Sequence, residues 1–310
     1  MPGSVLRFYC ERILPLMKIA INSDYCGSVG NPVPRLKAIA EAGFTHIHWC
    51  HHWNTDFFYT APELRTIKQA FQDFGLTLLD IHGSDGNEKC WYSTDETSRQ
   101  AGVLLVRNRM EMFAELGGIG SLMMHIPAYR STWTEEQREE SAIAAKLEAL
   151  YRTLDELMPY CEKYNCPIAV ENTADDTFET IHALMQKYDP KWMGITYDSG
   201  HGNIREAKGL DRLEPVKDRL MALHLNDNDH SGDQHQPPFY GNVDWQRVAN
   251  LLDASGYQRE MLSFELSMRN TPFMNQELHI TDQTPEAQLS FLKDAYERCC
   301  KVARLTKRFC

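Results

Sequence analysis

Residues 167–198 read PIAVENTADDTFETIHALMQKYDPKWMGITYD, and this stretch decides the fold. It begins with the apolar run Pro167–Glu171, continues through the helical pattern of Thr177–Tyr188, and ends with a second apolar run, Met193–Asp198. Short apolar runs suit buried parallel strands, and two parallel strands need a crossover that is usually a helix. The stretch therefore predicts one strand–helix–strand unit of an α/β protein.

The same alternation covers the chain from residue 17 to residue 310. The other predicted strands are Lys18–Asn22, Thr45–Trp49, Thr77–His82, Ser121–His125, Met221–Leu225 and Met261–Glu265. The other predicted helices are Pro34–Ala42, Pro62–Phe74, Ser98–Leu116, Glu135–Tyr164, Asp211–Asp218, Trp245–Ser255 and Pro285–Ala303. Glycines follow several of these helices, where a left-handed C-terminal cap favours them: Gly43, Gly75, Gly117–Gly118 and Gly256.

Eight strands alternating with helices, with no linker between them, predict a single-domain (β/α)₈ TIM barrel over residues 17–310. Residues 1–16 are expected to form an N-terminal extension. An open, doubly wound sheet is the alternative. It would usually have a glycine-rich phosphate loop after the first strand, and Asp24–Asn31 lacks the required spacing.

Composition limits the partners and the compartment. The 310 residues carry a formal net charge of −11, so neither nucleic acid nor an anionic membrane surface is an expected partner. Nine scattered cysteines without a C-x-x-C pair indicate reduced thiols and a cytoplasmic location. The apolar stretch in residues 1–16 is too short, and too interrupted by charge, for a signal peptide or a membrane span.

Carboxylates and imidazoles recur at the carboxyl ends of the predicted strands, which form the active-site face of a TIM barrel. They are His48, His82, His125, Glu171, Asp198, His201, His224 and Glu265. A single strand-end glutamate could simply be solvated, but repetition over four consecutive strands favours a metal site. We expect Glu171, Asp198, His224 and Glu265 to bind one divalent ion, with Mn²⁺ favoured and Mg²⁺, Co²⁺ or Zn²⁺ compatible.

Two further groups leave alternatives open. Asp233 and His235, in the segment HLNDNDHSGDQHQPPFYGNVDW (224–245), belong either to a surface loop before a helix cap at Asp244 or to a loop that folds over the metal pocket. Aromatic segments around Trp49 and Trp91 either pack on the barrel rim or a neighbouring subunit, or stack on a substrate. We expect Trp49, Trp91, His82, His201, Asp233 and His235 to bind substrate.

The chain resembles the xylose-isomerase-like TIM barrel superfamily from about Met17 to its C-terminus. The resemblance is carried by AVEN around Glu171, YDSGH at 197–201, LHLNDND at 223–229, DQHQPP at 233–238 and FEL around Glu265. Similarity to the ketose 3-epimerase branch implies that Glu171, Asp198, His224 and Glu265 hold one metal. It also implies that the two glutamates exchange a substrate proton and that His201 binds a substrate oxygen. That branch has an arginine shortly after the seventh-strand histidine, where this chain has Asp227–His230.

Two other branches imply different chemistry. Similarity to endonuclease IV implies a trinuclear zinc site and cleavage of abasic DNA, with nine matching positions: His82, His125, Glu171, Asp198, His201, His224, Asp233, His235 and Glu265. Similarity to the large subunits of C-glycoside deglycosidases implies a lyase acting on 3-oxo-glycosides with a small second subunit, and His125 as general base.

The sequence thus predicts a divalent-metal-dependent sugar isomerase or epimerase. It would abstract a proton next to a carbonyl and form an enediolate, with Glu171, Glu265 and His125 as catalytic residues. The substrate would be a carbohydrate or glycoside, and the partner, if any, a second copy of the chain or a small second subunit.

Overall fold

The computed structural model describes residues 17–127, 140–174, 177–205 and 207–309. Within them, eight parallel strands form one sheet in the order β7-β6-β5-β4-β3-β2-β1-β8. The strands are β1 (Ile19–Asn22), β2 (His46–Trp49), β3 (Thr77–His82), β4 (Leu122–His125), β5 (Ile168–Glu171), β6 (Met193–Asp198), β7 (Leu220–His224) and β8 (Leu262–Phe264). Every predicted strand is present, and no strand end differs from its prediction by more than one residue.

The sheet closes into a barrel between β7 and β8, the two strands at the ends of this order. A parallel bridge joins Leu225 to Phe264 just beyond β7. The backbone N–H of Leu225 donates to the Ser263 carbonyl at 3.0 Å, and that of Glu265 donates to the Leu225 carbonyl at 3.1 Å. The predicted single-domain (β/α)₈ barrel is therefore confirmed.

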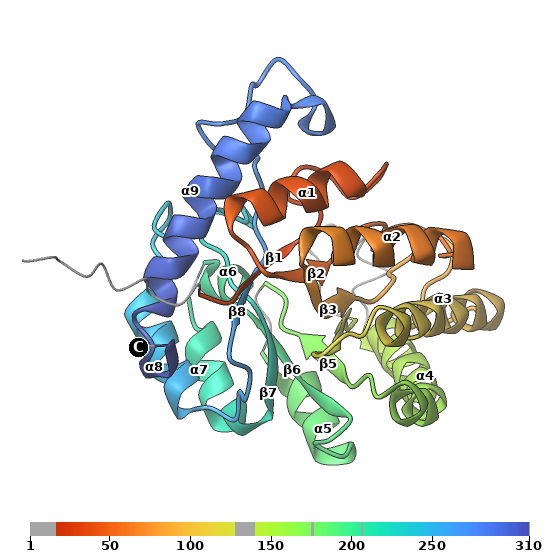
Figure 1. The fold of residues 1–310 in the computed structure, drawn as a ribbon. Helices are drawn as coiled ribbons and strands as arrows, with labels where there is room; N and C mark the ends of the chain where they lie inside the picture. The colour runs from red at the N-terminus through yellow and green to blue at the C-terminus, as the bar shows by residue number, and fades with distance from the viewer. Residues whose placement is uncertain (1–16, 128–139, 175–176, 206, 310) are drawn as a thin grey trace, which may run out of the picture.

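Helices surround the strands as an outer ring (Figure 1). They are α1 (Val33–Ala42), α2 (Ala61–Phe74), α3 (Glu96–Glu115), α4 (Glu140–Tyr164), α5 (Glu179–Lys187), α6 (Ser199–Asn203), α7 (Gly209–Leu213), α8 (Trp245–Ala254) and α9 (Pro285–Ala303). Short 3₁₀ helices occupy Glu214–Arg219, Ile280–Asp282 and Lys307–Phe309. The first five residues of the predicted helix Glu135–Tyr164 and the predicted extension 1–16 lie outside the described residues.

One predicted helix is wrong. The stretch Asp211–Asp218 is not one α-helix, because α7 ends at Leu213 and a 3₁₀ helix, Glu214–Arg219, follows it. Pro215 explains the change, since a proline has no N–H to continue the i→i−4 bonding of an α-helix.

The glycines after the helices serve two purposes. Gly43 and Gly75 have φ values of 108° and 66° and cap α1 and α2 in the left-handed conformation, as predicted. Gly256 does not, since its φ is not positive. Instead, a Cβ at Gly256 would lie 2.2 Å from the carbonyl oxygen of Asp218, so close backbone approach requires this glycine.

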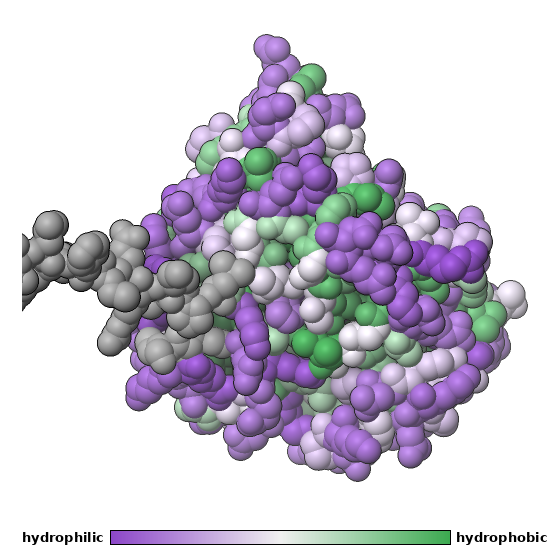
Figure 2. All heavy atoms as spheres, viewed as in Figure 1, coloured by the Kyte–Doolittle hydropathy of each residue, from purple (hydrophilic) through white to green (hydrophobic). Residues whose placement is uncertain are grey.

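Apolar side chains fill the space between the strands and the helices. The largest fully buried ones include Trp49, Trp91, Phe113, Phe264 and Phe291. On the face in Figure 2, hydrophilic residues cover much of the outer ring and hydrophobic residues gather nearer the centre. None of the helices in the described part of the chain is long and apolar enough to cross a membrane.

Candidate metal centre

The sheet register brings the polar strand ends together. Glu171, the last residue of β5, is paired with His125 at the end of β4. Asp198, the last residue of β6, is paired with His224 at the end of β7. Because these strands are neighbours in a closed parallel barrel, their carboxyl ends surround one space.

His224 lies between two carboxylates. Its Nδ1 is 2.7 Å from Oε1 of Glu171 and 2.7 Å from Oε2 of Glu265. One ring nitrogen carries at most one proton, so the two oxygens can only share that proton or compete for it. Burial alone would raise the pKa of Glu171 and of Glu265, but His224 holds both below their usual range. In return, and against the effect of burial, the two glutamates raise the pKa of His224 well above its ordinary value.

Asp198 is held by hydrogen bonds on both oxygens. Oδ1 accepts from the backbone N–H of His201 at 2.7 Å and thereby caps the first turn of α6. Oδ2 accepts from Nδ2 of Asn226 at 2.9 Å. Burial, together with the charge of Glu171, raises the pKa of Asp198 to about 6. Asn172 fixes the Asp198 backbone by donating to its carbonyl at 3.0 Å and accepting from its N–H at 2.8 Å.

The loop after β7 returns to the barrel mouth. Asp227 and Gln236 exchange two backbone hydrogen bonds of 2.8 and 2.9 Å, which turn the intervening residues back. Asp233 then lies with Oδ1 2.9 Å from Nε2 of His235 and Oδ2 3.4 Å from Nε2 of His201. Both alternatives for this segment hold in part, because Asp244 also caps α8 by accepting from the N–H of Arg247.

His201 and His235 expose the same ring nitrogen to Asp233. The carbonyl of Asn172 lies 2.9 Å from Nδ1 of His201, and the carbonyl of Glu265 lies 3.2 Å from Nδ1 of His235. A carbonyl oxygen only accepts, so Nδ1 is the donor in each ring and a neutral ring has its lone pair on Nε2. This arrangement is common in metal-binding histidines.

His82, His125 and Trp53 form a group of neighbouring rings beside Glu171. The Trp53 ring lies 4.4 Å from the His82 ring and 5.5 Å from the His125 ring. His125 Nε2 is 2.9 Å from Oε2 of Glu171. Although burial opposes it, pairing with Asp85 and Glu171 raises the pKa of His125 to about 9. Burial, aided by the charge of His125, lowers the pKa of His82 to about 3, so this ring is neutral.

Trp49 and Trp91 lie elsewhere, in the hydrophobic core. Trp49 follows the inward-facing His48 in β2 and therefore points to the opposite face of the sheet, where its Nε1 donates to the Tyr59 hydroxyl at 3.1 Å. The backbone of Trp91 packs against Gly102 of α3, where a Cβ would lie 2.4 Å from the backbone nitrogen of Trp91. The structure does not bring either tryptophan to the carboxylate cluster.

Sequence reasoning missed three residues around the site. Asn172 directly follows the predicted ligand Glu171, and Asn226 lies two residues after the predicted ligand His224. Only this closeness in sequence could have indicated that the two asparagines lie beside the site. Trp53 belongs to the same aromatic segment as Trp49, and nothing in the sequence distinguishes which of the two faces the pocket.

Among the described residues, three groups of side chains have the chemistry of a metal site, and two of them consist wholly of predicted site residues. The ligand atoms of Glu171, Asp198, His224 and Glu265 all lie within 4.8 Å of one another, and those of His201, Asp233 and His235 do too. Ligands across a divalent ion stand roughly 4–4.4 Å apart at ordinary bond lengths. Three buried carboxylates with one imidazole are also costly without a compensating cation. The first group could therefore hold a divalent ion with only small side-chain shifts.

Fold and site together define a class: (β/α)₈ barrels with a carboxylate–histidine cluster at the carboxyl ends of the strands. The model of the xylose isomerase-like TIM barrel family matches residues 36–295. The chain belongs to this family.

Other proteins are similar to this chain in sequence or in fold. An uncharacterised protein of Sinorhizobium fredii, y4fM, is 29% identical over 255 residues, covering 75% of this chain and 80% of the relative. A D-tagatose 3-epimerase-like protein has a similar fold, with a TM-score of 0.67, 19% identity, and coverage of 92% of this chain and 99% of its own.

Two further solved structures share the fold. The 3-keto-D-glucoside 4-epimerase YcjR of E. coli has a TM-score of 0.64 and 19% identity, covering 90% of this chain and 99% of its own. The IolI protein with a bound zinc atom has a TM-score of 0.64 and 16% identity, covering 95% and 99%.

Proposed function

We propose that this protein is a divalent-metal-dependent sugar isomerase or epimerase that moves a proton at a carbon next to a carbonyl. The family and the epimerase neighbours support the reaction class. The carrying observation is the pair of carboxylates, Glu171 on β5 and Glu265 after β8, whose oxygens both lie 2.7 Å from Nδ1 of His224.

Glu171, Asp198, His224 and Glu265 would hold the ion, and a bound divalent ion would polarise the substrate carbonyl. Mn²⁺ is our first choice, and the zinc of the IolI structure supports keeping Zn²⁺ as an alternative. The low pKa of both glutamates keeps them ionised, so either can accept a proton from the substrate and return it. His201 and His82 would bind substrate oxygens beside the carboxylates.

Deuterium exchange tests this proposal. The metal-loaded protein is incubated in D₂O with a panel of ketoses, ketose phosphates and 3-keto-glucosides, and mass spectrometry locates deuterium at the carbon next to the carbonyl. We expect exchange with at least one substrate and its loss in Glu265→Gln. Absence of exchange across the panel would count against enolisation.

Trp53 favours a second candidate, a lyase acting on 3-oxo-glycosides. Its ring covers His82 and approaches His125, so a flat aromatic leaving group could stack there next to an imidazole paired with Glu171. Release of an aromatic aglycone from 3-oxo-glycosides is followed by absorbance. Trp53→Ala should slow release, whereas Trp192→Ala, a half-buried tryptophan just before β6, should not. Equal rates in the two variants would contradict the lyase candidate.

A further inference from the structure

His48 is a buried imidazole that has no role among the proposed ligands, acid–base groups and substrate-binding residues. It lies in β2, is 0% exposed, and its ring stands 4.2 Å from the ring of His224. Among the described residues, neither of its ring nitrogens has a hydrogen-bond partner. An unsatisfied buried polar group costs about 1–3 kcal/mol, so such a group in a folded protein calls for a ligand, a water or an ion.

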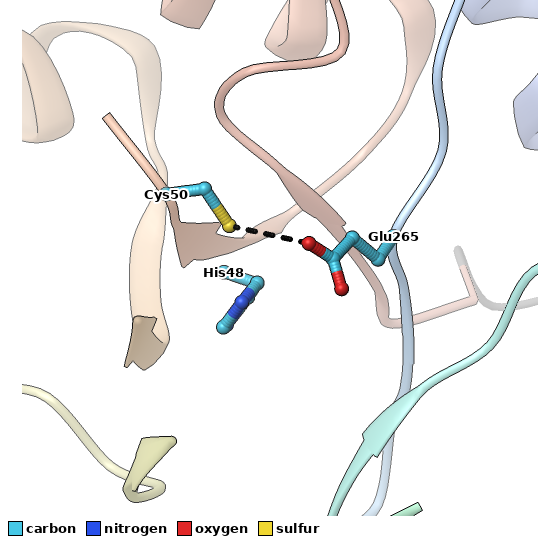
Figure 3. A group of neighbouring side chains, drawn as sticks. All are labelled: His48, Cys50 and Glu265. Atoms are coloured by element: carbon cyan, nitrogen blue, oxygen red, sulfur yellow. Dashed lines mark hydrogen bonds between the residues drawn. The ribbon is translucent and has the colours of Figure 1, made fainter. Parts of the chain in front are cut away.

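Two donors of different chemistry stand beside it. Cys50 follows two residues later in the chain and so lies on the same side of the strand, toward the barrel interior. Its Sγ is 4.0 Å from Oε1 of Glu265. The ligand atoms of His48, Cys50 and Glu265 lie within 4.8 Å of one another, and all three residues are buried. Figure 3 shows the three side chains facing a common space, with Cys50 and Glu265 joined by the dashed line.

Nitrogen, sulfur and oxygen donors together select one class of ion. Thiolate disfavours Mg²⁺ and Ca²⁺, whereas Zn²⁺ and its thiophilic relatives accept all three donors. At zinc bond lengths, the donors of a tetrahedral ion stand roughly 3.4–3.6 Å apart. Closing the 4.0 Å between Cys50 and Glu265 to that distance takes about half an ångström of side-chain movement.

We propose that His48, Cys50 and Glu265 form a second binding site, for a thiophilic divalent ion of the zinc class. The site adjoins the first one through Glu265, whose Oε2 faces His224 while Oε1 faces Cys50. A carboxylate that bridges two ions is a common arrangement in two-metal sites. Binding converts the Cys50 thiol to a thiolate and releases its proton to the solvent.

Cobalt provides a readout that does not depend on activity. The metal-free full-length protein is titrated with Co²⁺, because a Co²⁺–thiolate bond produces a charge-transfer band in the near ultraviolet that nitrogen and oxygen ligands do not. We expect the band to saturate in the wild type and in Cys161→Ser, a buried cysteine in α4, and to be absent from Cys50→Ser. No band in the wild type, or an unchanged band in Cys50→Ser, would overturn the proposal.

A second variant tests the imidazole. His48→Gln keeps a polar side chain of similar length, and we expect Co²⁺ to bind at least about tenfold more weakly in the band titration, since even outer partners of metal ligands contribute that much. Circular dichroism verifies that the variant is folded. An unchanged affinity would exclude His48 from the site.

Competition identifies the class of ion. Zn²⁺ added in modest excess should displace Co²⁺ and remove the band from the wild type, whereas Mg²⁺ at the same concentration should leave it. Equal displacement by the two ions would show that the site has no preference for thiophilic metals, against the proposal.

Discussion

Glu171 and Glu265 each place one oxygen 2.7 Å from Nδ1 of His224. Their other oxygens differ, because Oε2 of Glu171 faces His125 and Oε1 of Glu265 faces Cys50. If each acts on one face of the substrate carbon, neither can replace the other. We expect Glu171→Gln and Glu265→Gln each to reduce the rate of deuterium exchange by about 10²–10⁴, the range of a general acid or base.

Each variant is measured at saturating metal, with metal content determined in parallel, so that loss of the ion is separated from loss of the acid or base. Glu63→Gln changes a partly exposed capping residue of α2; it is the matched control and should keep the wild-type rate. Full activity in either site variant would remove that residue from the catalytic pair.

Asn226 would act on a bound ion indirectly, through its hydrogen bond to Asp198. It donates to Oδ2 of Asp198 at 2.9 Å, and its only other hydrogen bond to the four proposed ligands in the described part of the chain is to the His224 carbonyl at 3.3 Å. Asn226→Ala should therefore weaken metal binding about 10- to 100-fold by releasing Asp198, as measured by competition with a chelating dye. Asn250→Ala, on the exposed face of α8, should bind metal like the wild type. Equal affinities in all three proteins would contradict the positioning role of Asn226.

At the scale of elements, Gly75 and Gly256 are required for different reasons, backbone conformation at Gly75 and lack of space for a side chain at Gly256. Gly75 has a φ of 66° with open space around its missing Cβ, so Gly75→Ala should cost about 1–2 kcal/mol from backbone conformation alone. Gly256→Ala should cost more, because the new Cβ would overlap the Asp218 carbonyl. Urea denaturation measures both free energies of unfolding, and the reverse order would contradict this assignment.

The sequence predicted the strands well because buried parallel strands are short apolar runs, and each run has a polar residue at its carboxyl end or one position before it. It predicted elements poorly where tertiary contacts decide. The helix α6 is only Ser199–Asn203, a glycine-rich stretch with weak helix propensity that depends on its cap at Asp198. The stretch Asp211–Asp218 has helical spacing, but its proline converts the second half to a 3₁₀ helix.

The site was predictable in part for the same reason. Strand-end carboxylates and histidines can be located by counting from the apolar run, and Glu171, Asp198, His224 and Glu265 come together as the register requires. The direction of an aromatic side chain cannot be located in this way. Trp49 and Trp53 are four residues apart, and only the turn after β2 determines that Trp53 faces the histidines while Trp49 enters the core.

For the whole molecule, the proposed metal binding would be linked to stability. An ion that binds only the folded state stabilises it by RT ln(1 + [ion]/Kd), about 2.7 kcal/mol at a hundred times Kd. We expect the melting temperature to fall when a chelator removes the ion and to return when Mn²⁺ is added, as measured by calorimetry. Asp198→Asn should show a much smaller difference between the two conditions, and an equal difference would place the stabilising ion elsewhere.

Because the barrel closes between β7 and β8, the metal site can be completed only after the last strand has been synthesised. Three of the four proposed ligands belong to the consecutive strands β5, β6 and β7, which can pair while the chain is still being synthesised. Glu265 directly follows the final strand, β8, and its backbone N–H makes one of the two hydrogen bonds to Leu225 that close the barrel. A nascent chain that ends before residue 265 would lack one of the four proposed ligands. Tight metal binding would therefore begin only when the barrel is complete.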